Sequence, residues 1–193
     1  MDVSRYNHSD SVSIDRSPAD VYEIVSDVTR VGELSPVCQS GTWDDPAQAG
    51  KAGAWFTGHN VVGEYSWDTH CQVSVADPGR EFMFVNNGPN REAELVRWGF
   101  TLEPEGTGTK ATESWQVLPS YPAFLRSGNP DIDVAERVKG MAQMARTGIE
   151  EIWQFAGQGG TLRKRSVSNR PRCAINRIVA NAQVVDSCCR EKN

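Results

Sequence analysis

Residues 14–28, which read IDRSPADVYEIVSDV, decide how the first part of this chain folds. Val12 and Ile14 alternate with polar residues, and this period of two predicts a short strand. Ser17 and Pro18 then suit the N-cap and the first position of a helix. Apolar residues follow at helical spacing, so the stretch predicts a strand that runs directly into an amphipathic helix.

The middle of the chain predicts an antiparallel sheet. A second short helix is expected over 29–34, and Pro36 ends it. Beyond it, short runs rich in aromatic and β-branched residues alternate with turn signals such as ADPGRE and NNGPN. The runs lie too close together for parallel crossovers, which favours a meander. The expected strands are 38–44, 53–61, 64–76, 80–86, 93–103 and 109–118.

A long helix is expected after the strands. In residues 130–156, apolar residues recur at steps of three and four. An antiparallel sheet with one apolar face needs a cover, and this helix is the largest element that can supply one. We therefore expect an α+β fold in which an antiparallel sheet wraps around a C-terminal helix. The expected divisions are a flexible N-terminus over 1–9, one domain over 10–157, and a basic tail over 158–193 that is disordered or weakly helical.

The composition is typical of a globular domain and not of a membrane-spanning or disordered chain. The chain is 38% hydrophobic and has six Trp and six Phe, which is typical of a globular domain. No apolar run reaches the ~18 residues of a membrane span, and the N-terminus lacks the apolar core of a secretory signal, so a cytoplasmic location is expected. Residues 159–193 contain eight Lys/Arg against two Asp/Glu, a basic tail on an acidic body.

Several kinds of site are not expected. Five Cys at irregular spacing and only three His do not match a zinc site, so no metal or cofactor is predicted. The segment EGTGT reads as a hairpin turn, because no helix follows it to hold a phosphate. The basic run RKR at 163–165 is short and follows an acidic body, so nucleic-acid binding is not expected either. The oligomeric state is left open.

Strand alternation assigns side chains to an inner, aromatic-rich face of the sheet. One predicted set is Trp67, Thr69, Cys71, Val73 and Val75. Each aromatic side chain alone is most simply part of a packed core, but aromatic walls under a single helix also leave an apolar cavity. Both interpretations stay open. For the second, the predicted ligand-contacting residues are Phe56, Asn60, Trp67, Thr69, Phe84, Trp98, Phe100 and Trp115, with Leu34 and Met141.

Glu113 and His59 are the candidate catalytic residues. Glu113 shares its alternation with Ala111 and Trp115, so its carboxyl group is expected on the inner face, where loss of water raises the pKa. Such a group acts as a general acid or base, or as a hydrogen-bond partner of a ligand. The alternative is an ion pair, or a bulge that turns the side chain outward. His59, at a hairpin end, either edges the cavity or is solvated.

Four stretches resemble the START/polyketide-cyclase-like (SRPBCC) superfamily over about residues 10–157: IDRSPADVYEIVSDVTRVGELSP, GAWFTGHN, WDTHCQVSVADPGREFMF and RWGFTLEPEGTGTKATESW. The chain is most similar to small actinobacterial-type members described as polyketide cyclase/dehydrase and lipid transport. The resemblance implies a helix-grip fold, a seven-stranded antiparallel sheet that grips a C-terminal helix around a hydrophobic pocket. Leu34 stands where many relatives carry an aromatic residue, and the tail has no counterpart.

The expected function is binding of a small hydrophobic or amphipathic molecule, such as a polyketide, a lipid or an aromatic metabolite. Its affinity would come mainly from apolar area that leaves water. The alternative is a polyketide aromatase/cyclase or dehydratase that uses the same pocket. In that case Glu113 or His59 would move protons.

Overall fold

The computed structural model describes residues 2–140 and 142–143. Several predictions fall outside the described residues: Met141, most of the long helix expected over 130–156, and the tail over 158–193. Within the described range, residues 134–140 are helical, so the beginning of the long helix is present where the periodicity predicts it. Asp133 caps this beginning, because its Oδ1 accepts a hydrogen bond from the backbone N–H of Glu136 at 3.1 Å.

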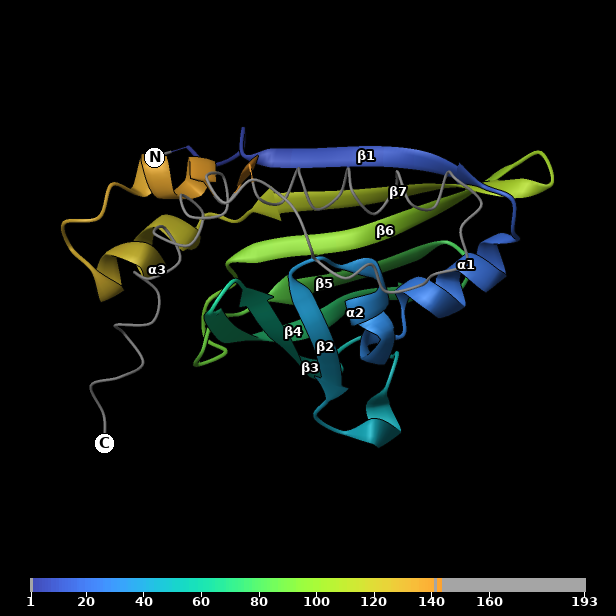
Figure 1. Cartoon of the computed structure of the whole chain (residues 1–193), viewed down its shortest axis with the longest axis horizontal. Helices are drawn as coiled ribbons and strands as arrows, with labels where there is room; N and C mark the ends of the chain where they lie inside the picture. The colour runs from blue at the N-terminus through green and yellow to red at the C-terminus, as the bar shows by residue number, and fades with distance from the viewer. Residues whose placement is uncertain (1, 141, 144–193) are drawn as a thin grey trace.

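A seven-stranded antiparallel sheet forms the body of the protein (Figure 1). Its strands follow the order β1-β7-β6-β5-β4-β3-β2, so β1 and β2 are the two edges. The α+β class and the predicted meander are confirmed, since β2 to β7 pair in sequence and β1 returns beside β7. The strands are β1 (Asn7–Ile14), β2 (Cys38–Trp43), β3 (Trp55–Val62), β4 (Tyr65–Asp77), β5 (Glu81–Asn86), β6 (Val96–Glu105) and β7 (Gly108–Val117).

The predicted capped turn is present at the beginning of the first helix. The Ser17 hydroxyl accepts a hydrogen bond from the backbone N–H of Asp20 at 3.2 Å and donates one to the Asp20 carboxylate at 2.8 Å. Two short helical segments follow at the place expected for the second helix. The elements are α1 (Pro18–Val25), η1 (Val28–Arg30) and α2 (Val31–Leu34), with a further turn of 3-10 helix, η2 (Pro46–Gln48).

The short helices pack against different parts of the sheet. Contacts join α1 to β5, β6 and β7, whereas η1 and α2 contact the edge strand β2. The approach at β2 is close enough to require glycine: a Cβ atom on Gly41 would lie 2.3 Å from the backbone oxygen of Val28. The short helices therefore cover the sheet both at β5 to β7 and at the edge strand β2.

One helix was not predicted. α3 (Tyr121–Gly128) follows β7 and buries Tyr121 and Leu125. Its sequence, YPAFLRSG, covers about two turns of weak periodicity, with Pro near its beginning and Ser-Gly at its end. Burial of two large side chains stabilises this segment, and that contribution is not visible in local sequence.

The first strand begins earlier than predicted. β1 begins at Asn7, and Val3 is buried in the core, although residues 1–9 were assigned to the N-terminus ahead of the domain. Every second residue of β1, from His8 to Ile14, is half-buried. Two of these half-buried residues, His8 and Asp10, are polar, so the sequence shows an apolar alternation only at Val12 and Ile14.

A β-bulge in β4 makes the predicted inner-face set of this strand wrong at its end. The register with β5 shifts between Val73 and Val75, so that Val73 pairs with Phe84 but Ala76 pairs with Phe82. Ala76, not Val75, therefore packs against the buried cluster. A bulge adds one residue to one strand and reverses the faces beyond it, so alternation counted through it fails.

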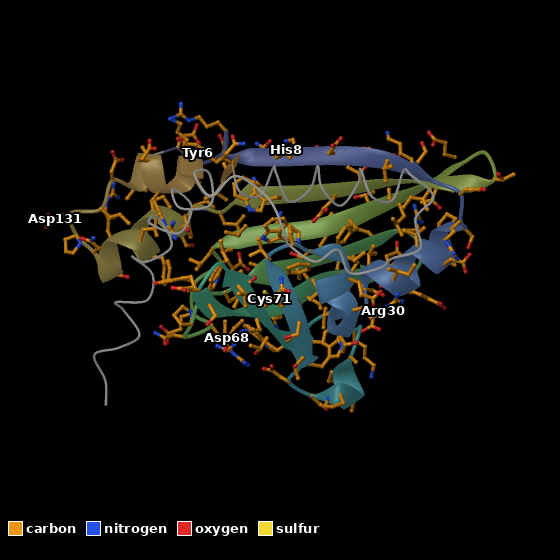
Figure 2. The ribbon with its side chains drawn as sticks, in the orientation of Figure 1. Tyr6, His8, Arg30, Asp68, Cys71 and Asp131 are labelled. Atoms are coloured by element: carbon orange, nitrogen blue, oxygen red, sulfur yellow. The ribbon has the colours of Figure 1, made fainter. Side chains whose placement is uncertain are left out.

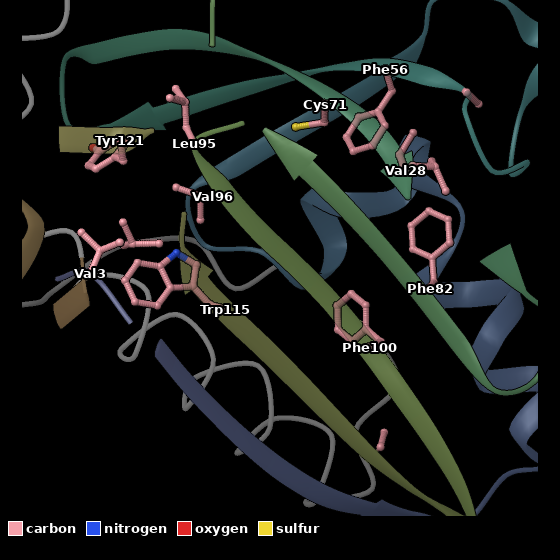
Figure 3. Packing of buried hydrophobic residues seen from close by; sticks show 14 of the residues in the cluster. Val3, Val28, Phe56, Cys71, Phe82, Leu95, Val96, Phe100, Trp115 and Tyr121 are labelled. Carbon is pink, nitrogen blue, oxygen red and sulfur yellow. The ribbon is translucent and has the colours of Figure 1, made fainter. Parts of the chain in front are cut away.

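The core lies on the inner face of the sheet (Figure 3). Phe82, Phe100 and Trp115 come from three strands and join one buried cluster that also contains Val134 and Val138 of the helical segment 134–140. The helix therefore begins on the inner face, as a helix-grip arrangement requires. Among the described helices, none combines the length and the apolar character needed to cross a membrane.

Candidate functional site

Glu113 lies in the interior, at the middle of β7. It pairs with Asp10 of β1 on one side and with Phe100 of β6 on the other, and only 5% of the residue is exposed. Its Oε2 atom is buried and has no hydrogen-bond partner in the described part of the protein. Burial raises the pKa of the Glu113 carboxyl group to about 8, because an apolar environment disfavours the charged form.

The surroundings of Glu113 are aromatic. Phe100 faces it across the strand pair, and Trp115 follows two residues later on the same face. The Trp115 ring meets Trp98 edge to face, with centroids 6.1 Å apart. β7 pairs with both neighbours without a register shift, so no bulge turns Glu113 outward. No ion pair found among the described residues includes it.

Three further polar atoms on buried positions lack partners among the described residues: His8 Nε2, Trp115 Nε1 and Arg137 Nε. His8 pairs directly with Trp115, so both side chains extend from the same face of the β1–β7 pair. Arg137 belongs to the helical segment 134–140 and is close enough to Tyr121 to lower its pKa, although burial raises that pKa by more. His8 and Arg137 were not predicted as site residues. In the sequence, His8 shares the alternation of Val12 and Ile14, so extending the predicted strand back to residue 8 would have placed His8 on their face.

On the same inner face but nearer the β2 edge of the sheet, the polar groups of β3 and β4 form hydrogen bonds with one another. The Asn60 Nδ2 atom donates to the backbone oxygen of Gly58 at 3.2 Å, to that of Trp67 at 3.3 Å and to Thr69 Oγ1 at 3.3 Å. The Thr69 hydroxyl donates to the Gly58 oxygen at 3.3 Å. Asn60 and Thr69 therefore stabilise the β3–β4 pair, and the donor groups predicted to orient a ligand are already bonded.

Two thiols lie near this network. Cys38 is half-buried and Cys71 is fully buried. Burial raises the pKa of the Cys38 thiol to about 11 and that of the Cys71 thiol to about 12. Both side chains therefore stay protonated at neutral pH and are poor nucleophiles.

Aromatic rings form a continuous row across the inner face. Phe56 contacts Phe84, with centroids 5.2 Å apart, and Phe84 contacts Phe82 at 6.2 Å. Trp43 of β2, which was not predicted, extends the row to the edge of the sheet through a contact with Phe56 at 5.5 Å. Phe56 and Phe82 are buried, but three predicted ligand-contacting residues on this face are only half-buried: Trp67, Phe84 and Trp98.

The structure separates His59 from Glu113. His59 lies on the outer face, where 48% of its side chain is exposed and Nδ1 is hydrogen-bonded to Asp68 Oδ1 at 2.8 Å (Figure 2 labels Asp68). Of the two alternatives for His59, this position agrees with a solvated side chain and not with one at the edge of an inner cavity. Leu34, at the end of α2, is half-buried.

Comparison with known proteins identifies the family. Residues 7–152 match the model of the polyketide cyclase/dehydrase and lipid transport family. This chain belongs to that family, and the resemblance noted from the sequence is confirmed. No sequence among the curated proteins matches the chain.

Solved structures share the fold. The chain is 35% identical to the Polyketide_cyc-like protein of Corynebacterium glutamicum, with a TM-score of 0.57 over 79% of this chain and 90% of the other. A protein of Mesorhizobium loti matches at 14% identity and a TM-score of 0.53, over 80% of this chain and 98% of the other. The di-domain ARO/CYC StfQ of the steffimycin biosynthetic pathway matches at 12% identity and a TM-score of 0.54, over 80% of this chain and 51% of the other. The last two likenesses show the fold alone.

Proposed function

We propose that this protein binds a small hydrophobic or amphipathic molecule between the inner face of the sheet and the helix that begins at residue 134. A polyketide, a lipid or an aromatic metabolite has the required character. Family membership supports a role of this kind without naming a ligand. The observation that carries the proposal is the buried Oε2 atom of Glu113, which has no hydrogen-bond partner among the described residues.

An unpartnered carboxyl group is costly in a folded protein. A buried polar group without a hydrogen bond costs about 1–3 kcal/mol, and native proteins keep few of them. Glu113 lies in a regular strand among apolar side chains, where a hydrophobic residue of similar size would stabilise the fold more. Its presence is explained if a bound molecule completes its hydrogen bonds.

The aromatic side chains give the second support. Trp98 and Phe84 belong to the inner face, yet they stay half-buried while their neighbours Phe82 and Trp115 are fully buried. A bound apolar molecule would remove this remaining surface from water, with a gain of ~25 cal/mol for each Å². The aromatic rings would therefore supply most of the affinity, and Glu113 would supply orientation.

Calorimetric titration with 2-ethylnaphthalene, a compact apolar probe, tests the proposal. We expect saturable binding with a negative heat-capacity change, which marks burial of apolar surface. Trp98→Leu should weaken binding about tenfold, whereas Trp55→Leu should not. Trp55 is the matched control because it is half-buried beside Arg91, whose guanidinium lies 4.8 Å from its ring centroid. Absence of binding, or equal loss in both variants, would overturn the proposal.

An enzymatic role is the second candidate, and the protonation state of Glu113 favours it. With a pKa of about 8, the group is mostly protonated at neutral pH and able to donate a proton. A general acid of this kind assists cyclisation or dehydration of a poly-β-ketone by protonating a carbonyl or a leaving hydroxyl group. The aromatic wall would hold the flexible chain in a folded conformation.

Substitution of Glu113 separates the two candidates. Glu113→Gln keeps the shape and the hydrogen-bonding capacity of the side chain but cannot donate an acidic proton. For an enzyme we expect turnover of a linear poly-β-ketone to fall by about 10²-fold or more while binding changes little. If the wild type leaves every such substrate unchanged but binds it, the protein is a binder only.

A further inference from the structure

At one end of the inner face lie hydrogen-bonding atoms that have no partner within the part of the chain that the structure describes. His8 and Trp115 pair across the strands β1 and β7, at the beginning of one and near the end of the other (Figure 2 labels His8). Trp115 is 2% exposed, and both its Nε1 and His8 Nε2 are buried without a partner in the described structure. Two residues before Trp115 in β7, Glu113 Oε2 is a third polar atom on the same face without a partner among the described residues.

The helix supplies a group of the same kind. Arg137 Nε is buried and also lacks a partner within the described residues. Val134 and Val138, on either side of it in the helix, belong to the buried cluster that includes Val3 and Trp115 (Figure 3). The helical segment 134–140 lies beside the beginning of β1 (Figure 1), so Arg137 comes from the same end of the molecule as His8 and Trp115.

The nitrogen atoms of His8, Trp115 and Arg137 that lack a partner among the described residues are all able to donate hydrogen bonds. An indole N–H and a guanidinium N–H only donate hydrogen bonds, and an imidazole nitrogen is able to donate. Two carboxyl groups lie beside them on the β1–β7 pair: Asp10 Oδ1 already accepts a hydrogen bond from the backbone N–H of Ser11 at 2.8 Å. The buried Glu113 is mostly protonated at neutral pH, because burial raises its pKa to about 8, and in that form its hydroxyl is a further donor. A group bound here is therefore required to accept hydrogen bonds.

We infer that the end of the inner face formed by His8, Trp115 and Arg137 is a subsite for an acceptor oxygen, so that the ligand is an amphipathic molecule with a carbonyl or carboxylate at one end. This inference rests on the proposed function and adds an orientation to it. The oxygen-bearing end lies at His8 and Trp115, and the apolar remainder lies along Trp98 and Phe84. On β3 and β4, toward the other edge of the sheet, the amide nitrogen of Asn60 already donates to Gly58, Trp67 and Thr69 and does not compete for that oxygen.

Three probes of nearly equal shape test the subsite: 2-ethylnaphthalene, 2-acetylnaphthalene and 2-naphthoate. They carry the same ring system with no oxygen, a neutral carbonyl, or a carboxylate. We expect the full-length protein to bind at least one oxygen-bearing probe about tenfold more tightly than 2-ethylnaphthalene, since the hydrocarbon leaves the donors unpaired. Which of the two binds more tightly distinguishes a neutral ligand from an anionic one.

Variants connect that preference to particular atoms. His8→Phe keeps a planar ring and removes Nε2, while Trp115→Phe keeps an aromatic side chain and removes Nε1. In each, the preference for the oxygen-bearing probe over 2-ethylnaphthalene should fall by about tenfold, and because both probes are measured on the same variant, a general loss of apolar affinity cancels from this ratio. His59→Phe is the matched control, a histidine of the same sheet on its outer face, and should keep the full preference.

A spectroscopic measurement on the wild type tests the subsite even if the variants fold poorly. In the wild type labelled with ¹⁵N, the indole N–H resonance of Trp115 should move downfield and exchange more slowly with water when the oxygen-bearing probe is added. The hydrocarbon should not produce that change, because it cannot accept the hydrogen bond. Loss of the resonance in Trp115→Phe assigns it.

The outcomes separate this inference from the proposed function. If no probe binds, both are wrong. If 2-ethylnaphthalene binds as tightly as the other probes, and the Trp115 resonance does not respond to either of them, the subsite is wrong and the apolar binding function stands. Preference that survives His8→Phe and Trp115→Phe would also overturn the subsite.

Discussion

The two faces of the sheet differ in how their polar side chains are partnered. On the outer face, His59 bonds to Asp68 at 2.8 Å, and Arg91 pairs with Asp44 at 2.5 Å. On the inner face, Glu113 Oε2 and Trp115 Nε1 have no partner among the described residues. Water would satisfy the outer groups at little cost even without these pairs, whereas the inner groups have no such alternative.

This difference indicates that the functional site lies on the inner face of the sheet. The partnered outer groups contribute to solubility and slightly to stability. The unpartnered inner groups reduce stability, and a binding role explains why they are present. Regions of a protein that carry such a cost are frequently functional, because stability and function impose different demands on the same residues.

The largest expected effect comes from the apolar part of the inner face. Phe82 is fully buried and contacts Tyr22 and Phe84. Phe82→Ala should lower the free energy of unfolding by about 3–5 kcal/mol, through lost burial and the cavity that remains. Urea unfolding followed by circular dichroism measures this. Phe82→Leu should lose less, and a loss below about 1 kcal/mol for the alanine variant would show that this face is not the core.

The second prediction concerns Glu113 and pH. Its pKa is about 8 in the folded protein against an ordinary value of 4.5, so between these values the folded state holds more proton than the unfolded state. Stability from this group is therefore fully present below pH 4.5 and falls as the pH rises to about 8, by at most about 1.4 kcal/mol for each pH unit.

Glu113→Gln removes that dependence. The variant and the wild type should have similar stability near pH 4.5, and the variant should be more stable by a few kcal/mol at pH 8 and above. Thermal unfolding of both proteins over this pH range measures the difference directly, since all other titrating groups are shared. Parallel curves for the two proteins would show that folding does not raise the pKa of Glu113.

A smaller effect is expected at Asn60, a buried inner-face residue whose amide donors are satisfied. Asn60→Ala removes three hydrogen bonds to Gly58, Trp67 and Thr69, and it should cost about 1–3 kcal/mol of stability. Because these bonds are internal, affinity for 2-ethylnaphthalene should stay within about twofold of the wild type. Loss of probe binding without loss of stability would instead make Asn60 a ligand-binding residue.

The smallest effect is expected on the outer face. The His59–Asp68 pair is about half exposed on both sides, so His59→Ala and Asp68→Ala should each change stability by about 0.5 kcal/mol or less. A double-mutant cycle gives the coupling between them. A coupling above about 2 kcal/mol would contradict the view that outer-face pairs contribute little.

Most of the fold was predictable from local pattern. The strands, the capped turn at Ser17 and the short helices appear where periodicity and turn residues place them, because these signals depend on neighbours along the chain. The bulge after Val73 and the helix that begins at Tyr121 were missed. Both depend on packing against distant strands, which no local window contains.

The candidate site was predictable only in part. Alternation placed Glu113 and Trp115 on one face correctly, since strand geometry alone determines it. It did not reveal that His8 pairs with Trp115, because the partner of a strand is chosen by the whole sheet. Nor did it reveal that the Asn60 amide donors are already bonded, or that His59 faces outward toward Asp68.

The sequence by itself therefore determined the succession of elements, the faces of individual strands and the family to which the chain belongs. Only the tertiary structure decided which polar atoms find partners and which remain alone, as at Glu113, Trp115 and His8. The physical reason is that a side chain's periodicity depends on its own strand, whereas its hydrogen bonds and its exposure to water depend on residues far away in the sequence.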